Sequence, residues 1–214
     1  MTREENVLKY YVLCNKLKDV IRTGWKDWHV ERTRVESVAE HIYGVQMLAL
    51  AMHSEYKYDI DISKVIFMLA VHELEEIIIG DLTLFQISKE EKEKLGHNAL
   101  KEVLGCLITG EEIEKLIHEF DERKTKEAFF AYQCDKLECD IQSKIYGEED
   151  CVDLNNQDDN KSAKHPRVVA LLEEEKDWAR MWLKFGQEKY PYDENFKAVS
   201  DYAKENKIKE LIKN

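Results

Sequence analysis

The chain has 214 residues, of which 43% are hydrophobic and 36% charged, and its formal net charge is −12. This length suits one domain with a sizeable core. The acidic balance and the absence of a basic stripe exclude duplex nucleic acid as an expected partner. No apolar run is long enough to span a membrane, and the N-terminus lacks the layout of a signal peptide. The five cysteines have no paired spacing, which fits a reducing, cytoplasmic location.

Only two prolines and eight glycines interrupt the sequence, so long helices are expected. Apolar spacing predicts the first helix over residues 5–21, and residues 22–35 follow as a polar and aromatic connection. Ser37 and Glu40 form an S-x-x-E capping box, which predicts that a second helix begins there and runs to about residue 53. The same periodicity predicts further helices over about 61–79 (stopped by Gly80), 88–107, 110–120, 124–146, 166–186 and 193–212.

Residues 147–165 are polar, acidic and without helical periodicity, which predicts a long flexible loop. Too little chain follows this loop to form a second core. A single all-α domain over residues 1–214 is therefore predicted, with its core in residues 5–150 and the helices of 166–212 packed on that core. No convincing strand and no internal repeat is visible in the sequence.

The predicted helix over 61–79 carries unusual polar residues near its C-terminal end. At 100° per residue, His72, Glu73 and Glu76 fall on one face of this helix. Val65 and Leu69 lie upstream on the same face, so the helix is expected to be buried on both sides and the polar residues to line an internal cleft. Because an unpartnered buried charge is costly, a positive group is expected beside them.

Two other predicted helices each offer one inward polar residue. His41 lies in the first turn of the second helix, where the helix dipole favours a neutral imidazole that can bind a metal. Asp135 lies in an otherwise apolar row and needs a counter-charge. Together with His72 and Glu73, these residues form a set that suits a divalent transition metal. The alternatives from the residues alone are solvated surface charges and an ion pair from Asp135 to a lysine or arginine.

Four segments resemble the metal-dependent phosphohydrolases of the HD-domain family, and within that family the 5′-deoxynucleotidase branch. They are LKDVIRTGW (17–25), ESVAEH (36–41), HELEEIIIGD (72–81) and EAFFAYQCDKLE (127–138). The resemblance implies an all-α, bundle-like HD-domain fold and one divalent metal ion (Mn, Co, Fe, Zn or Mg). It also implies hydrolysis of deoxynucleoside 5′-monophosphates to deoxynucleoside and phosphate. A small-molecule nucleotide as substrate, a homodimer and a cytoplasmic location are expected with it.

The resemblance also implies roles for individual residues of this sequence. The implied metal ligands are His41, His72, Glu73 and Asp135. The implied catalytic carboxylates are Glu76 and Asp81. The implied substrate-binding residues are Arg22, which would face the phosphate, and Trp25, with Trp28 as a competing candidate for the aromatic position. The remaining histidines are expected to be structural or at the surface; they are at positions 29, 53, 97, 118 and 165.

The chain departs from the family pattern in two places. The signature doublet is His-Asp, whereas the second residue here is Glu73, whose carboxylate lies one methylene further from the backbone. The segment 82–88 lacks the prolines expected after Asp81. Three alternatives stay open: an HD phosphohydrolase for another small phosphate ester or nucleotide, a catalytically impaired nucleotide or metal sensor, and a helical scaffold without chemistry.

Overall fold

The computed structural model describes residues 1–83 and 86–212. Across these ranges the chain forms helices, and the sole strand-like pairing is an isolated bridge between Ile21 and Ser37. The prediction of an all-α fold is therefore confirmed. In chain order the elements are α1 (Arg3–Asn15), η1 (Lys16–Lys18), α2 (Thr23–Asp27), α3 (Val38–Tyr56), α4 (Ile62–Val71), α5 (Glu76–Ile79), α6 (Lys89–Leu104), α7 (Gly110–Glu122), α8 (Lys126–Glu148), α9 (Pro166–Glu175), α10 (Trp178–Lys189), α11 (Glu194–Glu205) and η2 (Ile208–Ile212).

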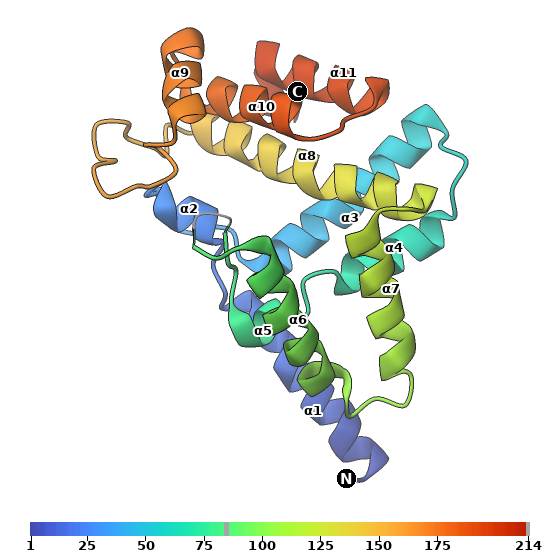
Figure 1. The fold of residues 1–214 in the computed structure, drawn as a ribbon. Coiled ribbons are helices and arrows are strands. Elements are labelled where there is room, and N and C mark those ends of the chain that lie inside the picture. Colours follow the sequence, from blue (N-terminus) through green and yellow to red (C-terminus); the bar gives the residue numbers. More distant parts are fainter. Residues whose placement is uncertain (84–85, 213–214) are drawn as a thin grey trace.

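Helix α8 crosses the middle of the molecule and packs against helices on both of its sides (Figure 1). Helices α3 and α4 contact it from one side, and α10 and α11 contact it from the other. Buried residues occur along nearly its whole length, so the helix is enclosed rather than amphipathic. Among the described residues, no helix combines the length and the apolarity that crossing a membrane requires.

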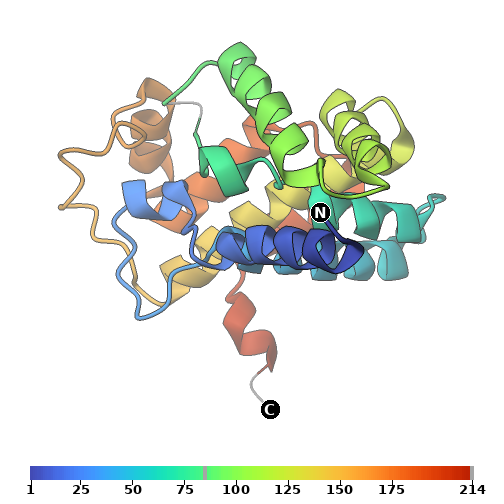
Figure 2. The same ribbon diagram turned by 90° about the horizontal axis from the view of Figure 1, so that it is seen from below.

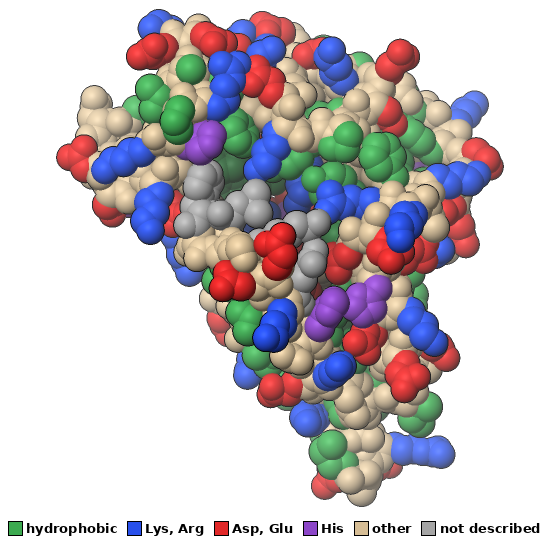
Figure 3. Space-filling model, viewed as in Figure 1, with side chains coloured by type: hydrophobic (Ala, Val, Ile, Leu, Met, Phe, Trp, Pro, Cys, Tyr) green, Lys and Arg blue, Asp and Glu red, His purple; other side chains and the backbone are tan. Residues whose placement is uncertain are grey.

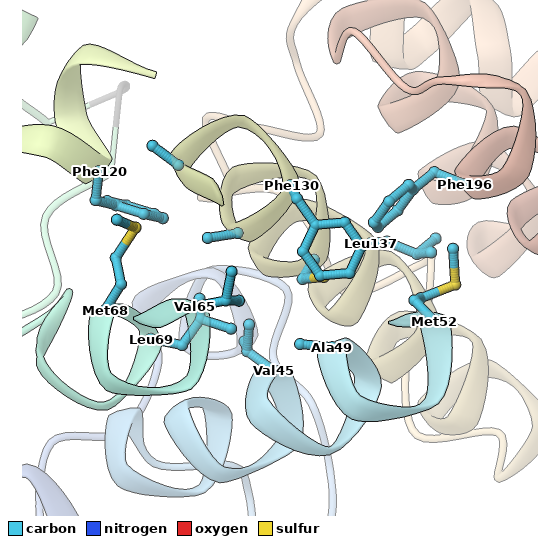
Figure 4. Close-up of a cluster of buried hydrophobic side chains, with 13 residues drawn as sticks. Val45, Ala49, Met52, Val65, Met68, Leu69, Phe120, Phe130, Leu137 and Phe196 are labelled. Atoms are coloured by element: carbon cyan, nitrogen blue, oxygen red, sulfur yellow. The ribbon is translucent and has the colours of Figure 1, made fainter. Parts of the chain in front are cut away.

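The main core lies where α3, α4 and α8 meet. Figure 4 shows Val45 and Ala49 of α3 close to Val65 and Leu69 of α4, with Phe130 of α8 beside them. All of these side chains are almost completely buried. Burial of each large one stabilises the fold by on the order of 1.5–3 kcal/mol. This packing also positions the site. His41 lies one turn before Val45 on α3, and His72 follows Leu69 by three residues at the end of α4.

The capping box at the start of α3 is confirmed. The Ser37 side chain accepts a hydrogen bond from the Glu40 amide, and the Glu40 carboxylate accepts one from the Ser37 amide at 2.8 Å. The predicted first helix, over 5–21, is too long. Helix α1 ends at Asn15 and the short η1 follows, after which the chain pairs with the start of α3: the amide of Val38 donates to the carbonyl of Val20 at 2.8 Å. This pairing ties the segment before α2 to the start of α3.

The prediction of one continuous helix over 61–79 is wrong. Helix α4 ends at Val71, a turn follows over 72–75, and α5 begins at Glu76. The His72 ring donates from Nδ1 to the carbonyl of Leu69 at 2.8 Å. That carbonyl is the acceptor that the Glu73 amide would use in a continuous helix, so the side chain competes with the helix. The predicted stop at Gly80 is confirmed, with φ at 72°.

Two predicted C-terminal helices are also divided. Helix α9 ends before Lys176, which has a φ of 57°, and Asp177 caps α10 by accepting from the amide of Arg180 at 2.7 Å. The segment predicted as a helix over 193–212 contains α11 and then the short η2. Within segment 82–88, which lacks the expected prolines, residues 84 and 85 lie outside the described ranges.

The segment after α8 is without helix up to Pro166, as predicted, and it lies beside α2 in both ribbon views (Figures 1 and 2). Gln157 donates from Nε2 to the carbonyl of Trp28 at 3.1 Å, and Asn160 donates to Gln157 Oε1 at 2.7 Å. Both amide residues are buried. The loop is therefore hydrogen-bonded to the N-terminal part of the chain, and its flexibility stays a prediction.

Candidate metal centre and active-site cleft

The four predicted ligands meet between α3, α4 and α8. Each of His41, His72, Glu73 and Asp135 offers one ligand atom, and these atoms all lie within 4.8 Å of one another. The two imidazoles and Asp135 are buried, and Glu73 is half-buried. The Nε2 atom of His41 lies 3.2 Å from Asp135 Oδ1. Residues from three separate elements therefore converge as the sequence predicts.

His41 is oriented from behind by a second carboxylate. Its Nδ1 donates to Glu138 Oε2 at 2.6 Å, which directs Nε2 toward the ligand cluster. Burial and Arg22 lower the pKa of His41, but Glu138 and Asp135 outweigh them and raise this pKa to about 9. The raised pKa goes against the expectation of a neutral imidazole in the metal-free chain, because the two carboxylates outweigh burial and Arg22. A metal at Nε2 would take the place of that proton.

His72 presents its ring in the same way. Its Nδ1 is held by the Leu69 carbonyl, and its Nε2 is buried with no hydrogen-bond partner. Burial lowers the pKa of His72, which favours the neutral ring. Metal-binding histidines characteristically donate one ring N–H to a carboxylate or carbonyl and present the other nitrogen to the ion. Both rings meet this description, so the residues fit a divalent metal.

Glu73 reaches the cluster despite its extra methylene. Its Oε1 lies 3.7 Å from His72 Nε2 and 3.7 Å from Arg22 Nη1. Burial would raise the pKa of Glu73, but the neighbouring cations Lys92 and Arg22 hold it below its usual range. The carboxylate is therefore ionised and available as a ligand. In this position the longer side chain also connects the ligand cluster to the arginine that the resemblance assigns to phosphate.

Asp135 has two partners. It therefore fits both hypotheses drawn from the sequence, the metal ligand and the ion pair to a lysine. One carboxylate oxygen faces His41, and the other accepts from Lys136 Nζ at 2.6 Å. Burial acts the other way, but Lys136 and His41 hold the pKa of Asp135 well below its usual range. The ion pair to a lysine, which the sequence left open as an alternative, exists and leaves Oδ1 directed at the ligand cluster.

Glu76 begins α5 and is 1% exposed. Its Oε1 accepts from Lys92 Nζ at 3.3 Å, while Oε2 is buried without a partner. Burial, with Glu73 and Asp81, raises the pKa of Glu76 well above its usual range. This carboxyl therefore holds a proton readily in the metal-free chain, and one of its oxygens remains unpaired in the site.

Asp81 is engaged by the start of α2. Its Oδ2 accepts from the amide of Thr23 at 2.6 Å, and its carbonyl accepts from the Thr23 hydroxyl, also at 2.6 Å. Arg22 directly precedes this helix and is the residue whose guanidinium contacts Glu73. Asp81 therefore holds the segment that carries Arg22 beside the ligand cluster.

Trp25 lies mainly in an aromatic cluster rather than in the open cleft. It is 1% exposed, its Nε1 donates to Glu36 Oε2 at 2.7 Å, and its ring meets Tyr146 edge-on at 5.2 Å between centroids. Trp28 is 2% exposed in the same cluster. Both tryptophans contribute to the wall of the cleft, and Trp182 packs on both of them.

A cleft of about 550 Å³ adjoins the ligand cluster, and Glu73, Glu76 and Asp81 line it. A smaller cavity of about 190 Å³ reaches His72 and Asp135. Sequence reasoning missed further cations and aromatic residues of the larger cleft, which are Lys92, Arg123, Lys136, Lys189, Tyr132, Tyr190, Trp182 and Phe185. Tyr132 and Lys136 carry a sequence signal, since both lie within three residues of Asp135 on the same predicted helix; the others come from segments that meet only in the folded chain.

Comparison with known proteins gives the family. The model of the HD domain matches residues 14–190, and this chain belongs to the HD domain family. A protein of Dictyostelium discoideum named 5′-deoxynucleotidase HDDC2 is 37% identical over 149 residues, which cover 66% of this chain and 77% of that protein. The Danio rerio protein of the same name is 32% identical over 177 residues, which cover 78% of this chain and 85% of that protein.

Solved structures give the same fold. A conserved hypothetical protein of Pyrococcus furiosus is 28% identical with a TM-score of 0.59, and the match covers 78% of this chain and 97% of that one. A Magnetospirillum magnetotacticum protein described as a predicted metal-dependent phosphohydrolase is 19% identical with a TM-score of 0.65, and the match covers 97% of this chain and 93% of that one. The predicted HD-domain fold is confirmed.

Proposed function

We propose that this protein is a metal-dependent phosphohydrolase that hydrolyses deoxynucleoside 5′-monophosphates to deoxynucleoside and phosphate. The observation that carries the proposal is a His–His–Glu–Asp set, with both histidines and the aspartate buried, beside a cleft lined by lysine and arginine in a chain whose net charge is −12. A phosphate monoester is the kind of small anion that such a cleft attracts. Membership of the HD domain family and relatives named 5′-deoxynucleotidase support the substrate class.

One divalent ion, of Mn, Co, Fe, Zn or Mg, would be held by the ligand set His41, His72, Glu73 and Asp135. When bound, an ion of this class polarises a phosphate oxygen and lowers the pKa of a water molecule. The protein's part is to keep the ligands in place. Glu138 and the Leu69 carbonyl do this by holding the Nδ1 atoms of the two histidines.

Arg22 binds the phosphate in this proposal. Its guanidinium lies beside Glu73 and lines the cleft, and the planar fork of an arginine suits two oxygens of one phosphate. Lys92 and Lys136 lie on the same cleft and add positive charge near the ligand cluster. Asp81 acts as a positioning residue, because it fixes the first turn of the helix that follows Arg22.

Glu76 handles the proton. Hydrolysis breaks the bond between phosphorus and the 5′ oxygen; water supplies the hydroxyl to phosphorus and a proton to the leaving oxygen. The unpaired Oε2 of Glu76 is buried in the site, and Lys92 fixes the other oxygen. Glu76 therefore moves the proton between the attacking water and the leaving oxygen.

A cytoplasmic homodimer is the form in which we propose that the enzyme works. All five cysteines are free, which supports a reducing compartment. Exposed apolar side chains lie along two helices: Val7, Leu8, Tyr11 and Val12 on α1, and Tyr43, Met47 and Leu50 on α3. Exposed apolar stripes of this kind commonly mark protein interfaces.

The proposal is tested by phosphate release from deoxy- and ribonucleoside 5′-monophosphates. The chain is stripped with a chelator and reloaded with each candidate metal. We expect metal-dependent release that favours deoxynucleotides and falls by about 10²–10⁴-fold in Glu76→Gln. Glu75→Gln is the matched control, because burial raises the pKa of Glu75 to about 8 and glutamine resembles its neutral form.

Other outcomes separate the alternatives. Metal-dependent release from a different phosphate ester, again lost in Glu76→Gln, would favour another HD phosphohydrolase. Metal binding with no release from any ester would favour a sensor, in which Glu73 has cost the chemistry. Absence of both metal binding and turnover would favour a helical scaffold without chemistry. Equal activity of Glu76→Gln and the wild type would remove Glu76 from the reaction.

A further inference from the structure

A second group of metal-ligand side chains lies between α6 and α7. His97 of α6 and His118 and Asp121 of α7 each offer one ligand atom, and these atoms all lie within 4.8 Å of one another. The two imidazole rings are perpendicular, at 87°, with centroids 4.6 Å apart. Figure 3 shows two histidine side chains touching on the surface where α6 and α7 lie in Figure 1. The sequence predicted both histidines to be merely structural or at the surface.

The helical spacing explains why these side chains meet. His118 and Asp121 are three residues apart and therefore share one face of α7. Helices α6 and α7 contact one another, and His97 faces that side from α6. Glu114, one turn before His118, places Oε1 at 3.7 Å from His118 Nε2. A second carboxylate therefore stands next to the group.

We propose that His97, His118 and Asp121 bind a zinc ion that fastens α6 to α7. Two imidazoles and one carboxylate are a ligand set that zinc prefers in proteins, and magnesium and calcium prefer oxygen ligands alone. Three protein ligands leave a fourth tetrahedral position for water or for Glu114. His97 and Asp121 are exposed and His118 is half-buried, so small rotations can close the group around an ion.

This zinc site would border the candidate metal centre without sharing a ligand with it. His97 and Asp121 line the cavity of about 190 Å³ that His72 and Asp135 also line. Helix α7 also carries Phe120, whose ring centroid lies 5.1 Å from that of His72. Fastening the two helices would therefore restrain one wall of the site. The proposal stands whether or not the chain is a nucleotidase.

The test counts zinc ions in the full-length, tag-free chain after chelator treatment and equilibrium dialysis. We expect two zinc ions per wild-type chain. The double variant His97→Ala/His118→Ala should keep only the ion of the candidate metal centre. His41→Ala should keep only the ion between α6 and α7. The matched control His53→Ala/His165→Ala removes the same number of histidines and should keep both ions. Asp121→Asn should lower the affinity for zinc at this site by at least about tenfold, since loss of even an outer partner of a metal ligand lowers affinity by that much.

A second readout is the melting temperature. In the His41→Ala background, zinc should still raise it, and the addition of His97→Ala/His118→Ala should abolish that rise. Zinc counts that are equal in the wild type and in His97→Ala/His118→Ala would overturn the proposal. So would a wild-type chain whose entire zinc content disappears in His41→Ala. Neither result depends on phosphate release, so failure of this site and failure of the proposed activity are distinguishable.

Discussion

Glu138 shows how one residue outside the ligand set can control the metal centre. It holds the Nδ1 atom of His41 at 2.6 Å and is itself 8% exposed. Gly44 leaves room for it, because a Cβ atom at that position would lie 2.5 Å from Glu138 Oε1. The resemblance covers Glu138 by sequence but assigns it no role, since the contact with His41 joins residues far apart in the chain.

We expect Glu138→Gln to lower metal affinity by about 10–100-fold while leaving every ligand in place. The reason is that a neutral amide holds the His41 ring less firmly than a carboxylate does. Gly44→Ala should act in the same direction by displacing the Glu138 side chain. Equilibrium dialysis measures the affinity. Glu127→Gln, in the first turn of α8, is the matched control, and an affinity equal to that of this control would contradict the role of Glu138.

Glu73 is the residue where the chain departs from its family. We expect Glu73→Gln to weaken metal binding and to raise KM for the nucleotide, because the change removes a ligand charge and the contact with Arg22. Glu75→Gln serves again as the control from the same turn. A lower affinity for metal with KM unchanged would show that the contact with Arg22 has no part in substrate binding.

At the scale of elements, helix ends place the site. His41 lies in the first turn of α3, and the capping box of Ser37 and Glu40 fixes that turn. His72 lies at the end of α4, where its own side chain interrupts the helix. Local chemistry at both ends therefore decides where two ligands stand. The same chemistry explains why the first of these ends was predictable and the second was not.

We expect Ser37→Ala to lower the free energy of unfolding by about 1 kcal/mol, the usual effect of losing a helix cap. It should also weaken metal binding, because the turn that carries His41 loses its anchor. Thr2→Ala removes the same kind of capping box from α1, which carries no ligand. Urea unfolding and dialysis give the two numbers. An equal loss of metal affinity in both variants would show that the cap of α3 has no special role.

At the scale of the whole molecule, α1 presents its apolar stripe to solvent. Apolar spacing is what predicts this helix, and its residues Val7, Leu8 and Tyr11 are each 62% exposed. Tyr43 and Met47 are exposed on α3 in addition. The packing partner is therefore missing within one chain, which is the basis of the proposed homodimer.

Sedimentation measures this assembly directly. We expect a dimer for the wild type and a shift to monomer for Met47→Glu, because a charge on the apolar stripe opposes its burial. Val169→Glu introduces the same charge at an exposed apolar position of α9 and should leave the dimer intact. A wild-type chain that sediments as a monomer at all concentrations would contradict the proposal.

The sequence by itself determined the helical class, the capping box at Ser37, the stop at Gly80 and the candidate ligands His41, His72, Glu73 and Asp135. These features depend on periodicity, capping and residue type over short stretches, and a resemblance of ordered segments adds to them.

The tertiary structure decided which side chains converge. It buried Trp25 among aromatic rings, brought Lys92 and Lys189 to one cleft, and set His97 against His118. The pairs involved are far apart in sequence or lie on different helices, so only packing could bring them together. Local periodicity gives the face of each helix, and the core between α3, α4 and α8 decides which faces meet.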